Sequence, residues 1–264
     1  MSNATTIASE SGHWYCAKTG EPRYTVIGKN GKERPTRITD ARDKGFVPSV
    51  TTITKILAAP GLDKWKQTQV LMASLTLPRL DNEPADKFAQ RVIEDAEAQS
   101  KAAREAGTKL HGEIEQWLSG KRKPSTVMVE IGYALQDVSV DLHTGKAERS
   151  FAHVEGYGGK VDWHNDSTVV DFKTKDRIED GKRLAYDEHA MQLAAYAHGL
   201  GIVAPRCLNV FIGVSDGKVV VHEWNAVEIG KGLRMFKLAL ELWQEKNDWQ
   251  GHKTVDQKLD EAGL

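Results

Sequence analysis

The chain has 264 residues, of which 40% are hydrophobic and 28% are charged, and its formal net charge is -1. This length is enough to bury a sizeable core in one large domain, or in one domain with a sub-domain. Folding therefore needs no disulfide bonds. The near-neutral balance excludes a chain that is basic throughout, and any nucleic-acid-binding surface must be a local patch.

The two cysteines, Cys16 and Cys207, lie far apart in the sequence and form no C-x-x-C pair. They exclude a disulfide framework and a four-cysteine metal or cluster site, and we expect a reducing, cytosolic environment. No apolar stretch approaches the roughly 20 residues that span a bilayer. The N-terminal segment MSNATTIASESG has no apolar core of a signal peptide, so we expect neither secretion nor a membrane location.

The first half of the chain is predicted to be mainly helical. Before the helices, aromatic and β-branched residues surround the turn at Lys29–Gly31 and predict a short hairpin. Ser49 suits the N-cap of a helix that ends near Pro60 and Gly61. Three further helices are expected over residues 61–75, over residues 84–106, which Gly107 ends, and over residues 109–120, which Thr108 caps.

The second half is predicted to hold the sheet. Short apolar runs divided by Gly, Asn and Asp indicate strands within residues 127–140, 146–164 and 168–176. A helix over 185–201, a hairpin turning at Asp216-Gly217 and a last amphipathic helix over 226–248 follow. We therefore predict an α/β fold with a mixed central sheet flanked by helices and an N-terminal helical region. The expected divisions are an arm and hairpin (1–45), a helical region (46–125), a core (126–250) and a tail (251–264).

The strand VVDFKTKD carries an acid and a lysine inside an apolar run. Side chains alternate along a strand, so Asp171 and Lys173 share one face, which we expect to be open, while Val170 and Phe172 point to the core. A short hairpin would pair Trp163 with Thr168 and Asp162 with Val169, which places Asp162 on the face of Asp171. Two carboxylates on one half-buried face repel each other, and a divalent cation between them would stabilise the arrangement.

Each of these features also has an ordinary explanation. Asp171 and Lys173 can form a plain ion pair, and His111, on or beside the inward face of its helix, can be a structural histidine. Gln192 and Tyr196, four residues apart on one helical face, can be surface and half-buried positions. Only the order in which these residues follow one another along the chain is distinctive.

That order runs through GTKLHGEIE with His111, GGKVD with Asp162, VVDFKTK with Asp171 and Lys173, and QLAAY with Gln192 and Tyr196. It resembles the RecB-like exonuclease branch of the PD-(D/E)XK nuclease superfamily, which includes phage exonucleases and the mitochondrial genome maintenance exonuclease. The segment VPSVTTITKIL is similar to the N-terminal stretch of those members. Two departures, Val161 in place of the proline and Asp171 at the D/E position, are variations within this branch.

The resemblance implies a hydrolytic site for Mg²⁺ or Mn²⁺. The metal ligands it implies are Asp162, Asp171 and the backbone carbonyl of Phe172, with His111 as a further ligand, and oxygen-rich ligation suits hard ions. Lys173 would orient the attacking water and help to deprotonate it. The four cysteines of iron–sulfur relatives are missing, so no cluster is expected.

Supporting roles fall to several other residues. Gln192 and Tyr196 would hold Lys173 and the phosphate in register, and Thr174 would add a hydrogen bond. Glu148 lies where relatives often place another acid, although an exposed strand carboxylate explains it equally well. Substrate contacts are expected from a group of hydroxyl and basic residues: Ser49, Thr51, Arg104 and Lys109.

The implied substrate is DNA, as single strands or ends. The implied setting is phage-type recombination or replication in a host cytoplasm. A recombination or replication protein is the implied partner, and no membrane is expected. Basic residues at 29–44 and 121–123 are candidate phosphate tracks, although acids interrupt the first group. Trp14, Tyr15 and Trp65 can stack on bases, but core packing explains each as well. The sequence leaves the strand polarity and the oligomeric state open.

Two other hydrolase motifs do not fit the sequence. A phosphate-binding loop at GYGGKVD would need Gly at Val154 and Ser or Thr at Val161, and no H-E-x-x-H zinc motif occurs. A catalytically inactive DNA-binding or assembly module that keeps the nuclease fold remains the alternative to an exonuclease.

Overall fold

The computed structural model describes residues 13–57 and 60–249. They form two compact units, one from residues 57–112 and the other from the described residues on either side of that segment. The polar N-terminal segment 1–12 and the tail 251–264 expected from the sequence lie outside the described residues. The expected helical region began at residue 46, but residues 46–56 pack in the larger unit. There strand β4 (Phe46–Pro48) contacts β6 (Tyr157–His164), and helix α3 (Val50–Thr54) contacts α7 (Asp187–Gly199).

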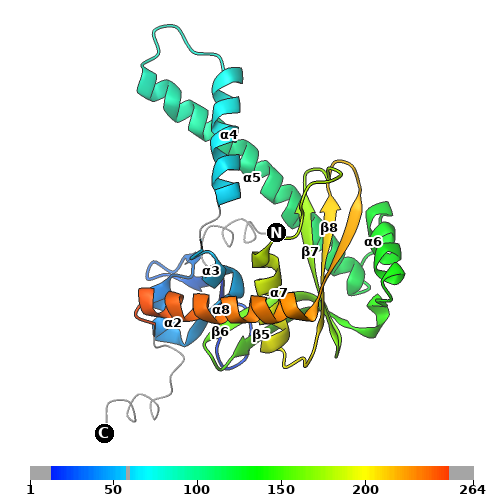
Figure 1. Cartoon of the computed structure of the whole chain (residues 1–264). Helices are drawn as coiled ribbons and strands as arrows, with labels where there is room; N and C mark the ends of the chain where they lie inside the picture. Colours follow the sequence, from blue (N-terminus) through cyan, green and yellow to red (C-terminus); the bar gives the residue numbers. More distant parts are fainter. Residues whose placement is uncertain (1–12, 58–59, 250–264) are drawn as a thin grey trace. The chain divides into compact units, whose positions relative to one another are not determined.

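A five-stranded mixed sheet forms the centre of the larger unit, which confirms the predicted α/β class (Figure 1). Neighbouring strands are antiparallel except for the central pair β7 and β8, which is parallel and is joined through helix α7 (Asp187–Gly199). In sheet order the strands are β5 (Lys146–His153), β6 (Tyr157–His164), β7 (Thr168–Lys175), β8 (Arg206–Gly213) and β9 (Val219–Trp224). The predicted hairpin at Asp216-Gly217 is therefore confirmed as the β8–β9 connection.

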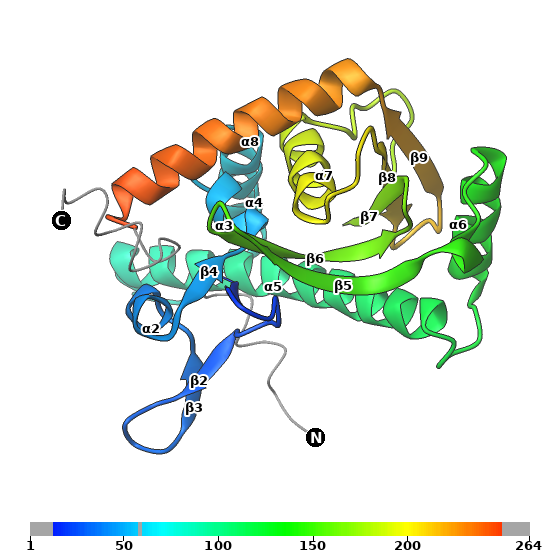
Figure 2. The same ribbon diagram turned by 90° about the horizontal axis from the view of Figure 1, so that it is seen from below.

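Helix α7 packs against β6, β7 and β8, and helix α8 (Ala226–Lys246) packs against α7 (Figure 2). The core under α7 includes Val169, Cys207 and Phe211, which share the face of Asp171 in the parallel register of β7 and β8. The opposite face is buried as well, because Val170 and Phe172 are at most 1% exposed. The expectation of an open face at Asp171 was therefore wrong: the crossover between two parallel central strands must lie on one face of the sheet, and α7 covers this one.

The N-terminal part of the larger unit contains the predicted hairpin, with β2 (Thr25–Ile27) paired to β3 (Glu33–Pro35). A second two-stranded sheet joins β1 (Trp14–Cys16) to β4 (Phe46–Pro48), and helix α2 (Ile38–Lys44) lies between β3 and β4 in the chain. Trp14 and Tyr15 are 3% exposed, so both are core residues. Ser49 caps the short helix α3 (Val50–Thr54), which ends well before Pro60.

Two helices that begin in the smaller unit correct the predicted boundaries. Pro60 begins helix α4 (Pro60–Thr76) instead of ending the one before it, because the ring of proline suits the first helical position, where no N–H partner is needed. Helix α5 (Ala85–Leu118) runs through Gly107 without a break, so Thr108 is not a cap. One glycine costs a helix only about 1 kcal/mol, and Gly107 is buried, where a small residue is suited to close packing.

The segment 127–140 was predicted to be a strand, and this was wrong. It forms helix α6 (Thr126–Asp137), whose buried residues Met128, Ile131 and Leu135 follow the helical spacing of three and four. The valines and the isoleucine favoured a strand locally, but burial of one helical face decides the structure here. A short 3-10 helix, η1 (Leu142–Thr144), leads into β5. Among the described helices, none combines the length and apolarity needed to cross a membrane.

Candidate active site

Strands β6 and β7 pair only near their connecting turn. The pairs are Trp163 with Val170 and His164 with Val169, so the predicted pairing of Trp163 with Thr168 was wrong by two residues. Asn165 explains the shift, since its side-chain oxygen accepts the N–H groups of Ser167 and Thr168 and fixes the loop. A shift of two preserves the alternation of side chains, so the face predicted for Asp162 is unchanged. Beyond Trp163 and Val170 the ladder is not continued.

Asp162 lies where this ladder stops. Its Oδ2 accepts the backbone N–H of Phe172 at 2.8 Å, so the carboxylate spans the interval between the two strands. Burial, and then the charge of Asp171, raises the pKa of Asp162 to about 7, while Lys173 and the Phe172 amide act in the opposite direction. Near neutral pH, a nearby cation would therefore stabilise the ionised form of the Asp162 carboxyl group.

Asp171 is 3% exposed and accepts hydrogen bonds at both oxygens. Lys173 Nζ lies 3.0 Å from Oδ1 and 2.9 Å from Oδ2. Gln192 Nε2 donates to Oδ1 at 3.1 Å, and Asn209 Nδ2 donates to Oδ2 at 2.8 Å. The lysine ammonium thus sits beside the buried carboxylate at the place where a cation would be most stabilised.

Helix α7 brings Gln192 and Tyr196 to this pair. Gln192 Oε1 accepts from Lys173 Nζ at 2.9 Å, and Gln192 Nε2 also donates to the Tyr196 hydroxyl at 2.8 Å. Burial, followed by the charges of Asp171 and Asp162, raises the pKa of Tyr196 well above its usual value, so the residue stays a neutral phenol. Gly159 on β6 allows this approach, because a β-carbon there would lie 2.7 Å from the Tyr196 ring.

Asn209 is a site residue that the sequence interpretation missed. It is fully buried on β8, directly beside Asp171 in the parallel register, and its Oδ1 accepts the indole N–H of Trp224 at 2.8 Å. The only local signal was one asparagine inside the apolar strand CLNVFIG. A buried amide in such a strand needs partners on both sides, and here they are Asp171 and Trp224.

Glu148 lies on β5 between the pairs that join Ala147 to Trp163 and Arg149 to Val161, which sets it opposite Asp162. Its φ of 58° is in the left-handed region, which is strained for a residue with a side chain. Its carboxylate forms an ion pair with Lys160. Burial raises the pKa of Glu148, Lys160 offsets that effect, and the charge of Asp162 adds to it.

The remaining predicted residues belong to other parts of the chain. Ser49 is buried and its hydroxyl accepts the Thr52 N–H at 3.0 Å, and Thr51 bonds to that same hydroxyl at 3.0 Å. Thr174 is half-buried on β7, on the face opposite Lys173. The other three belong to α5 in the smaller unit: His111 is half-buried, Lys109 is exposed, and the side chain of Arg104 lies outside the described residues.

The residues present fit a divalent cation. Asp162 and Asp171 lie on the same face of neighbouring strands, and burial together with the charge of Asp171 raises the pKa of Asp162. Asp171 already accepts from Lys173, Gln192 and Asn209, so a cation bound there would share or replace the lysine contact. Oxygen ligands of this kind suit Mg²⁺ or Mn²⁺.

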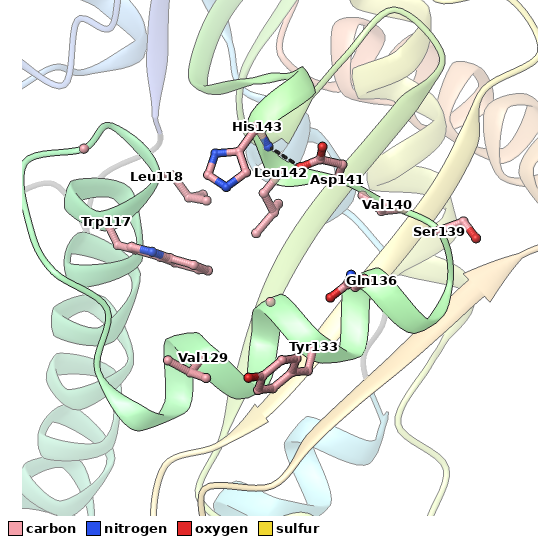
Figure 3. A pocket seen from close by; sticks show the side chains of 12 residues that line it. Trp117, Leu118, Val129, Tyr133, Gln136, Ser139, Val140, Asp141, Leu142 and His143 are labelled. Atoms are coloured by element: carbon pink, nitrogen blue, oxygen red, sulfur yellow. Dashed lines mark hydrogen bonds between the residues drawn. The ribbon is translucent and has the colours of Figure 1, made fainter.

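A cavity of about 810 Å³ lies apart from these carboxylates, among the end of α5, α6 and η1 (Figure 3). Trp117, Tyr133 and His143 are among its lining residues, and neither Asp162 nor Asp171 belongs to that lining. The catalytic candidates are therefore defined by their mutual contacts and not by this cavity.

No family model and no curated protein matches the chain. Among solved structures, it is similar to a protein from Eubacterium rectale assigned as an exonuclease, with 11% identity and a TM-score of 0.36 over 55% of this chain and 68% of the other. It is also similar to an alkaline exonuclease (LHK-Exo) from Laribacter hongkongensis, with 16% identity and a TM-score of 0.25 over 53% and 84%. The same enzyme in complex with dAMP gives 14% identity and a TM-score of 0.24 over 67% and 90%. These scores are too low to assign a family.

Proposed function

We propose that this protein is a metal-dependent hydrolase of phosphodiester bonds. The observation that carries the proposal is the contact of Asp171 with Lys173 and Gln192 in one buried network, with Asp162 facing it from the next strand. Two acids, a lysine and a supporting amide are what metal-assisted attack of water on a phosphodiester requires. More specifically, we propose a DNA exonuclease of the PD-(D/E)XK type.

The proposed roles follow from the contacts. Asp162 and Asp171, with the Phe172 carbonyl, would hold Mg²⁺ or Mn²⁺. When bound, the metal would neutralise charge on the scissile phosphate and lower the pKa of the attacking water. Lys173, oriented by Asp171 and Gln192, would hold that water, and its positive charge would favour the loss of the water's proton. Tyr196 is a neutral phenol, and its hydrogen bond would fix the position of Gln192.

The substrate we propose is single-stranded DNA or DNA ends, handled in recombination or replication together with a protein of that process. Basic residues support this, including Lys121, Arg122 and Lys123, which are all exposed. Arg34 is less suited to phosphate contact, because both of its terminal nitrogens bind Asp40 at 2.7 Å. Such contacts would make DNA binding weaker as salt increases.

The test is cleavage of end-labelled DNA, single- and double-stranded, linear and circular, with Mg²⁺, with Mn²⁺ and with EDTA. The variants are Lys173→Met and Asp171→Asn, and the matched control is Lys146→Met, an exposed lysine of the same sheet. We expect both site variants to lose at least about 100-fold in rate, since each removes a charge that acts on the transition state. The control should cleave like the wild type.

Cleavage of linear but not circular DNA, abolished by EDTA, would support an exonuclease, and the label released first would give its polarity. If the wild type binds DNA but cleaves no substrate with either metal, and the site variants bind equally well, the hydrolase proposal is wrong. The chain would then be a DNA-binding or assembly module on a nuclease fold. Thermal melting of each variant would show that folding is retained.

A further inference from the structure

A second group of metal-binding side chains lies away from the carboxylate pair. His153 ends β5, Glu155 lies in the turn between β5 and β6, and His198 lies in the last turn of α7. One ligand atom from each of the three residues lies within 4.8 Å of the others. The rings of His153 and His198 have centroids 4.6 Å apart, and all three residues are half-buried. Figure 2 shows the two strands and α7 that carry them side by side.

Tyr157 is placed to support a metal-binding tautomer of His198. Its hydroxyl lies 3.3 Å from the Ala195 carbonyl, to which it can donate, and 2.7 Å from His198 Nδ1. Metal binding at Nε2 requires a proton on Nδ1, and the Tyr157 hydroxyl can accept that N–H while it donates to Ala195. The lone pair of His198 Nε2 is then available, and the ring is held in the manner typical of metal-binding histidines.

His153 and Glu155 complete the donor set. The Glu155 backbone N–H donates to the Nδ1 lone pair of His153 at 3.3 Å, and a metal bound at His153 Nδ1 would replace this contact. Glu155 Oε1 binds Lys237 Nζ at 2.9 Å, while Oε2 faces His153 Nδ1 at 3.9 Å. Lys237 thus holds one carboxylate oxygen of Glu155, and the other oxygen faces His153.

We propose that His153, Glu155 and His198 form a binding site for a zinc-like transition-metal ion, separate from the site for Mg²⁺ or Mn²⁺. Two imidazoles and one carboxylate suit Zn²⁺ and fit poorly with Mg²⁺, which prefers oxygen alone. Ligands at the usual distances from a tetrahedral Zn²⁺ lie about 3.3–3.5 Å apart, so movements of about 1 Å would close the site. Water or solvent would take the fourth position.

Such an ion would join the β5–β6 turn to the end of α7. His198 follows Tyr196 by two residues, and Tyr196 holds Gln192 against the Asp171 network. Zinc would therefore stabilise the helix that completes the candidate active site without taking part in hydrolysis. Lys237 opposes binding through its charge, so its removal should strengthen the site.

The experiment uses the full chain carrying Asp171→Asn, so that a proposed ligand of the hydrolytic metal is already removed. In chelator-free buffer we expect one equivalent of Zn²⁺ to bind by calorimetry, and Co²⁺ to give the visible spectrum of a four-coordinate site. Adding His153→Gln or His198→Gln should weaken Zn²⁺ binding at least about 30-fold and abolish that spectrum. His143→Gln, an exposed histidine elsewhere in the same unit, is the matched control and should leave both unchanged.

The Zn²⁺ affinity of a Lys237 variant and the melting temperature with Zn²⁺ test the same site independently. Lys237→Met should bind Zn²⁺ several-fold more tightly, and saturating Zn²⁺ should raise the melting temperature of the parent by about 5 °C or more but not that of the His198→Gln chain. Absence of Zn²⁺ binding, or binding that both histidine substitutions leave intact, would overturn the proposal. Loss of DNA cleavage alone would leave it standing, because the titration is made in a chain without that activity.

Discussion

At the scale of single residues, the candidate active site depends on one buried amide as much as on its charges. Asn209 connects the Asp171 carboxylate to the Trp224 indole and has no contact with solvent. A buried carboxylate is tolerated only where donors surround it, and Asn209 is the donor that the neighbouring strand supplies. Its role is to hold Asp171 in one orientation.

We predict that Asn209→Leu lowers the free energy of unfolding by about 2–4 kcal/mol, because it leaves Asp171 Oδ2 and the Trp224 N–H without this partner. DNA cleavage should fall about 10–100-fold, as when an orienting partner of a ligand is lost. Denaturant unfolding and end-labelled cleavage measure the two effects. Trp224→Phe is the control: it removes only the donor to Asn209 and should retain most activity. An Asn209→Leu chain as stable as the wild type would contradict this account.

At the scale of elements, helix α7 decides whether the site is assembled. Its N-terminus is fixed by two contacts of His189. The imidazole Nδ1 of His189 accepts the backbone N–H of Tyr186 at 3.2 Å, and the backbone N–H of His189 donates to the Tyr186 carbonyl. Its other side lies against α8, where Gly232 meets the α7 backbone: a β-carbon there would lie 2.8 Å from the Ala190 carbonyl. Both contacts locate the helix that carries Gln192 and Tyr196.

The burial of His189 makes stability depend on pH. Burial, and then the charge of Lys173, lowers the pKa of His189 to about 4. The unfolded chain takes up this proton below about pH 6.5 but the folded chain does not until about pH 4, so stability is lost as the pH falls through that window, by up to about 3 kcal/mol.

His189→Gln should keep the cap, because glutamine can accept the same N–H, and should remove this part of the pH dependence. Unfolding of both chains at pH 7.5 and at pH 5 measures the difference. An equal loss of stability in the two chains would show that other groups cause it.

The α7–α8 contact gives a pair of opposite predictions within one helix. Gly232→Ala should lower stability by about 1–3 kcal/mol, because the methyl group would collide with backbone that cannot rotate away. Gly230→Ala, two residues earlier, meets only the end of the Arg234 side chain at 3.6 Å and should raise stability by up to about 1 kcal/mol. Thermal unfolding measures both. Equal effects of the two substitutions would contradict close packing at Gly232.

At the scale of the whole molecule, the two units differ in what holds each together. The larger unit buries a core that includes Phe211, Phe236 and Trp243, whereas the buried cluster described in the smaller unit consists of Ala73, Val92 and Ala96. Leu71 and Leu75 of α4 are more than 60% exposed. Burial of apolar area is the main source of stability, so the smaller unit should open more readily.

We predict that amides in residues 61–106 exchange with solvent at least about 100-fold faster than those in β8, measured by hydrogen–deuterium exchange with mass spectrometry. Amides of α6, a helix of the larger unit, serve as the control and should exchange more slowly than those of α4 and α5. Equal protection of α4 and β8 would mean that the smaller unit is stabilised by more than its own core.

The sequence by itself determined the polar pattern of the site. Side-chain alternation along a strand and the four-residue repeat of a helix are local, so Asp162, Asp171 and Lys173 on one face, and Gln192 with Tyr196 on another, could be predicted. The two hairpins and the last helix followed from equally local signals. A shift of the β6–β7 pairing by two residues left that pattern intact.

Only the tertiary structure decided what covers and completes that pattern. Asn209 reaches Asp171 through the parallel pairing of β7 and β8, and His198 reaches His153 through the packing of α7 on the sheet, neither of which has a local signature. Residues 127–140 favour a strand by propensity, yet they form α6, because burial of a helical face outweighs differences of about 1 kcal/mol. The covering of Asp171 by α7 has the same cause: contacts distant in sequence contribute more free energy than local preferences do.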